Sequence, residues 1–185
     1  KAKKAVRFTR GELEGVPDDF LQQIRTTNDE YIVMANVTWH YLALMDNAKR
    51  EETRKRFLIE HDNLAREANI PLLEKVLPLR DDIANKLGYR SWADYATEIK
   101  MVKNGGAAID FEEKLEAGLQ PKFTAELEEF RKLKVQETGD TKAQIRIWDW
   151  RYYSNQLKKQ KYDVDAEQLR IYFPYQRVLD GMFAI

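Results

Sequence analysis

Apolar residues recur at the spacing of a helix along nearly the whole chain. Between 70 and 88 they share one face of a helix, at Leu72, Leu73, Val76, Leu79, Ile83 and Leu87. Similar patterns predict helices over 39–50, 52–69, 91–103 and 107–139. The stretch 31–39 alone has the β-branched, partly alternating chemistry of a strand, and no partner strand is evident. We therefore predict an all-α fold, a multi-helical array or bundle with long kinked helices and at most one short strand.

Capping residues, glycine and proline indicate where these helices begin, bend and end. Ser91 is a natural N-cap, and Gly88 is suited to end the helix before it. Asp149 is placed to cap a helix over the aromatic stretch that follows it. Pro78 and Pro121 lie inside helical patterns, and we expect each to bend its helix.

The segment 104–106, Asn-Gly-Gly, is the clearest break in the helical pattern. We interpret residues 1–185 as a single helical segment with a possible internal boundary near 104–106. The sequence starts with Lys1 rather than Met and stops at Ile185 inside an apolar helical pattern. We therefore expect it to be a piece of a longer protein.

The composition disfavours several classes of protein. The 185 residues carry 31 basic and 31 acidic side chains, so the formal net charge is zero and nothing favours nucleic acid as a partner. There is no cysteine, which excludes disulfides and thiol chemistry and fits a reducing, cytoplasmic location. No apolar run approaches the roughly 18–20 residues that span a membrane, and no signal peptide is evident. We expect neither a nucleic acid nor a membrane to be a partner.

The side chains that could carry chemistry are few. The two histidines, His40 and His61, do not form the zinc-hydrolase motif H-E-x-x-H. The paired acids, such as Asp81 and Asp82, are adjacent on helices and point about 100° apart, so solvated helix surface explains them. There is neither a phosphate-binding glycine loop nor a nucleophile elbow. We predict no catalytic residue and no metal ligand in this chain.

An aromatic stretch, Ile-Trp-Asp-Trp-Arg-Tyr-Tyr at 147–153, stands out from this background. On a helix, Trp148 and Tyr152 would share one face and Asp149 and Tyr153 another. Tyrosine and tryptophan combine a large apolar body with one polar atom, which suits half-buried positions. The stretch could form a core or a seam between lobes, or it could line a ligand site.

The segment 147–185 resembles the region before the catalytic part of the thimet oligopeptidase, neurolysin and oligopeptidase A family of zinc metallopeptidases. The family pattern is an aromatic residue and Asp, then Arg or Phe before a Tyr-Tyr pair, then Val-Asp and Tyr-Phe-Pro. The matching residues here are Trp148, Asp149, Arg151, Tyr152, Tyr153, Val164, Asp165, Tyr172, Phe173 and Pro174. Earlier stretches also agree in order, including Thr-Arg at 53–54 and Leu-Gly-Tyr at 87–89. Val102 departs from the family's usual Ala. The resemblance covers nearly the whole chain.

This resemblance implies a mostly helical, two-lobed protein with a deep, narrow channel that admits short peptides. The family's zinc is held by H-E-x-x-H and a distal Glu, and this motif is absent from the 185 residues. The zinc is therefore expected in the full-length parent, with no cofactor in this chain. Trp148, Tyr152 and Tyr153 become candidates for the substrate channel, although packing between lobes is the interpretation we favour.

Two hypotheses follow. In the first, the chain is a non-catalytic scaffold and channel wall of a zinc-dependent oligopeptidase, inactive alone, whose partners are short peptides and the remaining part of the peptidase. In the second, it is a self-standing helical module, derived from such a peptidase, that binds peptides or a partner. Because a fragment would expose helix faces meant for missing parts, we also expect possible self-association through apolar faces.

Overall fold

The computed structural model describes residues 2–26, 28, 30–163, 165–169 and 172–184. Most of these residues are helical, which confirms the predicted all-α class. The elements, in chain order, are β1 (Ala5–Phe8), a 3₁₀ turn (Gly11–Leu13), α1 (Asp18–Ile24), β2 (Tyr31–Met34), α2 (Thr38–Asn47), α3 (Glu51–Asp62), α4 (Arg66–Lys86), α5 (Trp92–Thr97), α6 (Gly105–Thr138), α7 (Trp150–Tyr162), α8 (Ala166–Leu169) and α9 (Tyr175–Phe183).

The number of strands differs from the expectation of at most one. β2, inside the stretch with strand chemistry, pairs with β1 in an antiparallel ladder that sets Val6 opposite Val33 and Phe8 opposite Tyr31. Val6 and Phe8 point inward while their neighbours are exposed. The alternation in β1 lasts only four residues in a basic segment, so periodicity alone does not reveal it.

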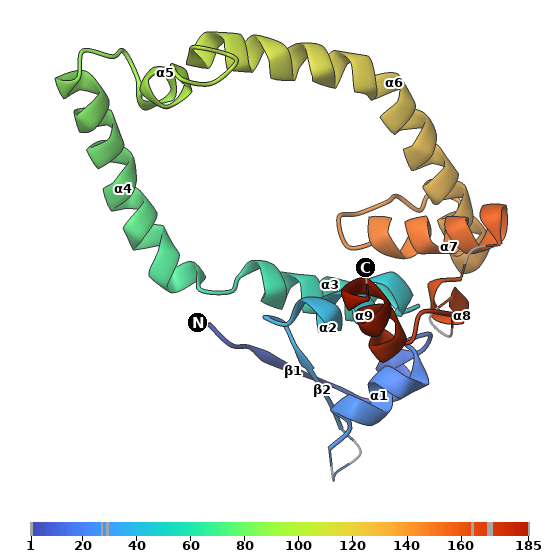
Figure 1. Cartoon of the computed structure of the whole chain (residues 1–185). Coiled ribbons are helices and arrows are strands. Elements are labelled where there is room, and N and C mark those ends of the chain that lie inside the picture. Colours follow the sequence, from blue (N-terminus) through green and yellow to red (C-terminus); the bar gives the residue numbers. More distant parts are fainter. Residues whose placement is uncertain (1, 27, 29, 164, 170–171, 185) are drawn as a thin grey trace.

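A compact base is built from the two strands and α1, α2 and α3 (Figure 1). Its core residues are Val6, Phe8, Leu13, Val16, Phe20, Leu21, Ile24, Tyr31, Val33, Ala35, Leu44, Met45, Ala48, Phe57 and Leu58. Trp148, from the loop before α7, packs against the edge of this core. α7 lies between α2 and α6 and contacts both.

Helices α4, α5 and α6 leave the base and return to it as an open arch (Figure 1). Residues 66–83 of α4 and 109–126 of α6 are exposed without exception. Both helices continue through internal prolines, Pro71 and Pro78 in α4 and Pro121 in α6. α6 bends along its length in Figure 1, as expected for a helix that lacks one backbone donor.

The capping predictions at the top of the arch are confirmed. The hydroxyl of Ser91 accepts a hydrogen bond from the Asp94 N–H at 3.1 Å, which starts α5. Gly88 follows the end of α4 with φ of +85°. The structure adds a cap that was not predicted, because Asn104 accepts a hydrogen bond from the Ala107 N–H at 2.8 Å at the start of α6. The segment 104–106 thus forms the N-cap and the first two residues of α6, and its role as a boundary stays a prediction.

Within the described ranges, none of the helices is both long enough and apolar enough to cross a bilayer.

Gly15 allows the turn before α1 to approach the end of α2. Its φ is +89°, and a Cβ there would overlap the carbonyl oxygen of Asn47. We expect Gly15→Ala to lower the free energy of unfolding by about 1–3 kcal/mol. Gly11→Ala is the matched control, because no atom lies within 4 Å of its Cβ position. Equal unfolding midpoints in urea for the two variants would contradict this assignment.

His40 joins α2 to β2 in its neutral form. Its Nδ1 accepts a hydrogen bond from the Met34 N–H at 3.0 Å, and its ring meets Phe20 edge-on at 5.2 Å. Burial lowers the pKa of His40 below its usual 6.5. The unfolded chain therefore takes up the proton at higher pH than the folded chain.

It follows that the stabilisation by His40 is complete above about pH 6.5 and is lost as the pH falls through the lower pKa of the folded state. Urea unfolding at pH 7.5 and pH 5.0 would measure this loss. His40→Gln keeps an acceptor for the Met34 N–H but does not titrate, so we expect a smaller fall in stability. An unchanged pH dependence in this variant would rule out the contribution of His40.

Candidate functional site

The aromatic stretch is organised around a buried carboxylate. Asp149 is fully buried, and its Oδ1 accepts a hydrogen bond from Arg54 Nη2 at 2.6 Å. Its Oδ2 accepts from Lys134 Nζ at 2.7 Å and from the Arg146 N–H at 3.0 Å. Asp149 stands at the N-cap position of α7 but makes no side-chain capping bond there. The prediction that its side chain caps this helix is therefore wrong, because two cations and a loop amide occupy the carboxylate.

Arg54 is the second buried charge of this cluster, with a relative exposure of 1%. Besides Asp149, its guanidinium donates to the carbonyl oxygens of Trp148, Ala48 and Lys49 at 2.7–3.1 Å. The Arg54 guanidinium carbon also lies 4.4 Å from the centre of the Tyr152 ring. A planar guanidinium with several fixed donors suits such a site, because each donor finds an acceptor.

Glu51 completes the charge balance of the cluster. It lies 2.8 Å from Lys134 Nζ and accepts from the Trp148 indole N–H at 2.9 Å. Burial alone would raise the pKa of Glu51, but the hydrogen bonds from Lys134 and Trp148 outweigh it and lower the pKa. Two cations thus face two carboxylates, which is the condition for burying charge without an unpaired ion.

Tyr152 and Tyr153 face inward beside this cluster, with relative exposures of 4% and 2%. The Tyr152 hydroxyl donates to Glu137 at 2.6 Å. Burial, followed by the neighbouring Glu137 carboxylate, raises the pKa of both phenols, so neither ionises near neutral pH. A hollow of about 260 Å³ between α6 and α7 reaches their edges and is also lined by Leu133, Gln136, Glu137, Gln156 and Gln160.

The structure therefore brings the three aromatic candidates, Trp148, Tyr152 and Tyr153, into one packed cluster of α3, α6 and α7. Each of the three side chains contacts neighbouring protein groups, and these contacts are those of packing residues. Whether any of them lines a substrate channel stays a prediction.

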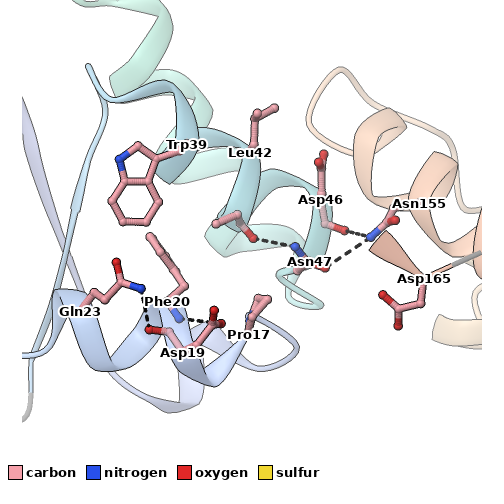
Figure 2. A pocket seen from close by; sticks show the side chains of 11 residues that line it. Pro17, Asp19, Phe20, Gln23, Trp39, Leu42, Asp46, Asn47, Asn155 and Asp165 are labelled. Atoms are coloured by element: carbon pink, nitrogen blue, oxygen red, sulfur yellow. Dashed lines mark hydrogen bonds between the residues drawn. The ribbon is translucent and has the colours of Figure 1, made fainter. Parts of the chain in front are cut away.

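A second hollow, of about 320 Å³, lies where α1, α2 and α7 meet (Figure 2). Phe20 and Trp39 form an aromatic wall, with ring centres 5.1 Å apart. Asn155 of α7 closes another side and donates to the Asp46 carbonyl oxygen at 3.0 Å. The full lining is Pro17, Asp19, Phe20, Gln23, Trp39, Leu42, Ala43, Asp46, Asn47, Asn155 and Asp165.

The lining of this hollow is partly polar and partly aromatic. Its lining contains carboxylates, amides and aromatic rings but no histidine, serine, lysine or cysteine. The Asp46 carboxylate is held by Arg151 at 2.6 and 3.2 Å, so it is not available as a general base. Trp39 remains 48% exposed and offers an apolar contact to a ligand.

The described residues do not fit a zinc ion. No group of three or more histidine, cysteine, aspartate or glutamate side chains converges within them as a metal site. The Nδ1 of His40 already accepts the Met34 N–H, and His61 pairs with Asp62 at 2.9 Å and lies against Tyr41. The family's zinc therefore finds no site in this part of the chain.

Sequence reasoning missed the buried ionic cluster and the second hollow. Arg54 and Asp149 are 95 positions apart, and each looks like an ordinary surface residue of a charged helix. The only signal was the position of Asp149 inside an aromatic run. The hollow joins residues of three helices, and no local pattern predicts such a meeting.

Replacing Asp149 by Asn keeps the side-chain size and removes the charge that Arg54 and Lys134 share. We expect a loss of about 3–5 kcal/mol in the free energy of unfolding, because two buried cations lose a partner. Asp82→Asn is the control, since Asp82 and Lys86 form an exposed pair on α4 worth less than about 1 kcal/mol. A loss for Asp149→Asn no larger than for the control, in urea unfolding, would refute the central role of this carboxylate.

Comparison with known proteins places the chain in a family. A sequence profile of Peptidase family M3 matches residues 44–185. Saccharolysin from Saccharomyces cerevisiae is 31% identical over 99% of this chain and 27% of its own length. A probable thimet oligopeptidase from Arabidopsis thaliana is 30% identical over 96% of this chain and 25% of its own length. Oligopeptidase A from Escherichia coli is 29% identical over 94% of this chain and 27% of its own length.

The chain therefore spans about a quarter of the length of these curated relatives. The resemblance seen in the motifs of the sequence is confirmed. Since the profile covers well over half of the residues, from within α2 onward, the chain belongs to Peptidase family M3.

Proposed function

We propose that these 185 residues are a non-catalytic segment of a zinc-dependent oligopeptidase, serving as scaffold and channel wall. The parent would bind zinc through the H-E-x-x-H motif, which lies outside this segment, and would cleave short peptides. Membership of a peptidase family supports this proposal, as do the names of the relatives.

The observation that carries the proposal is the amount of exposed surface. The accessible area is 13796 Å², whereas a compact monomer of 21.9 kDa exposes about 9,300 Å². The excess of about 4,500 Å² is as large as the area that obligate interfaces bury. Much of it lies on the arch, so further protein is needed to cover α4 and α6.

The stability expected for α4 also supports the proposal that further protein covers it. Residues 66–83 include two prolines, and each removes one backbone hydrogen bond from α4. Most of the stability of a helix in a protein comes from packing of its apolar face against other elements. The apolar side chains of α4 are also largely exposed, among them Leu72, Leu73, Leu77, Leu79 and Ile83. Such a helix persists when its apolar face is packed against other parts of the polypeptide.

Further parts of the proposal concern partners and location. The remaining part of the peptidase would be the main partner, and short peptides would bind through the parent. In isolation, the exposed apolar faces of the arch would favour self-association. We also propose a cytoplasmic location and a single structural unit over 1–185. Trp148, Tyr152 and Tyr153 would hold α7 in place beside the channel instead of contacting substrate.

The second hollow favours an alternative function. A self-standing helical module could bind a peptide or partner side chain against Trp39 and Phe20, with carboxylates and amides around it. This alternative predicts that the chain alone binds short peptides, and that Trp39→Ala weakens the binding. The scaffold proposal predicts no such binding by the isolated chain.

Two measurements test the proposed function. First, the purified chain should not cleave a quenched fluorescent peptide of about ten residues, with or without added zinc. Second, the amides of the exposed stretches 66–83 and 109–126 should exchange with solvent faster in the isolated chain than in the longer polypeptide. Cleavage that a chelator abolishes and that survives repurification, or slow exchange in a monomeric isolated chain, would overturn the proposal.

A further inference from the structure

An apolar row with an acidic border runs along the exposed middle of α6. Phe111, Leu115, Leu119 and Phe123 follow one another every four residues, and each is 50–61% exposed. Glu112, Glu116 and Gln120 follow at the same spacing, one position later, and so form a parallel row on the helix surface. We call these seven residues the acidic ridge of α6. A groove of about 700 Å³ runs along it.

The charged side chains that line this groove are mostly acidic. Among its lining residues, Lys122 is the only cation, and it lies 3.8 Å from Glu126. Neither Glu112 nor Glu116 forms an ion pair with any residue that the structure describes. Covering the apolar row would also remove water from these two carboxylates. A buried carboxylate without a partner is strongly unfavourable, so the covering surface has to supply cations.

The four-residue spacing of the ridge favours a helix as its partner. Rows at four-residue spacing are the ridges that pack into the grooves of a neighbouring helix. The exposed stretch 109–126 is about 27 Å long, which matches five turns of a second helix. A partner helix with apolar residues every three or four positions would cover Leu115 and Leu119. A row of Lys or Arg along its edge would reach Glu112 and Glu116.

We infer that the acidic ridge of α6 is the seat of a basic amphipathic helix from the same polypeptide, outside these 185 residues. This inference rests on the proposed function, and it names the partner that would cover the exposed face of α6. A source in the same polypeptide follows from two observations. The relatives are about four times as long as this chain, and the excess exposed area of the whole chain is within the range of obligate interfaces.

Overlapping 20-residue peptides that tile the polypeptide encoded on either side of this segment would test the inference. Binding to the purified chain would be measured by fluorescence anisotropy at low and at 0.5 M salt. We expect the tightest peptide to be a basic amphipathic helix. Its affinity should fall at least tenfold with the double substitution Glu112→Lys and Glu116→Lys, and should also weaken at high salt.

The control substitution is Asp110→Lys. Asp110 is exposed on the same helix, and its position in the turn directs it away from the apolar row. It makes half the charge change of the double substitution and leaves the ridge unaltered, so the peptide affinity should stay within about twofold. Circular dichroism of each variant would show whether the total helix content is unchanged.

Several results would overturn the inference. These are the absence of any bound peptide, a preference for acidic or uncharged helices, or equal effects of the ridge and control substitutions. Sedimentation showing a dimer that the double substitution dissociates would make a second copy the occupant. If α4 and α6 become protected from exchange in the longer polypeptide but no basic peptide binds, the scaffold proposal stands and only the inference fails. An open reading frame confined to these residues would overturn both.

Discussion

The attachment of the arch to the base depends on the buried Asp149 carboxylate. It connects Arg54 of α3, Lys134 near the end of α6 and the Arg146 amide in the loop before α7. Each of these groups belongs to a different part of the fold. Because a cation inside a protein needs a partner, removing the carboxylate would leave Arg54 without its carboxylate partner and Lys134 with Glu51 alone. The same atoms therefore hold three elements at one point.

This connection divides the molecule into two parts with different energetics. In the base, strands and helices bury a continuous apolar core. In the arch, long stretches of α4 and α6 bury almost nothing and still carry large apolar side chains. A segment of a larger peptidase would have this combination of one part with a buried apolar core and one part with exposed apolar side chains. On our inference, the acidic ridge of α6 makes a basic amphipathic helix the preferred partner of this exposed part.

Local signals predicted local features correctly. The helical spacing predicted the class of the fold, Ser91 predicted the start of α5, and Gly88 predicted the end of α4. Sequence reasoning failed wherever a feature needed residues far apart in the chain. The pairing of β1 with β2 was missed because β1 is too short to show its alternation. The role of Asp149 was assigned to capping because its cations lie 95 and 15 positions away.

The sequence by itself determined that the chain is helical, that it carries the motifs of a peptidase family and that it lacks that family's zinc motif. These are properties of spacing and residue type, which act over a few positions along the chain. The tertiary structure alone decided that the aromatic run encloses an ion cluster, that Phe20 and Trp39 wall a hollow, and that α4 and α6 stand uncovered. The physical reason is that burial and charge pairing depend on distances in space, and neighbouring residues in sequence do not set those distances.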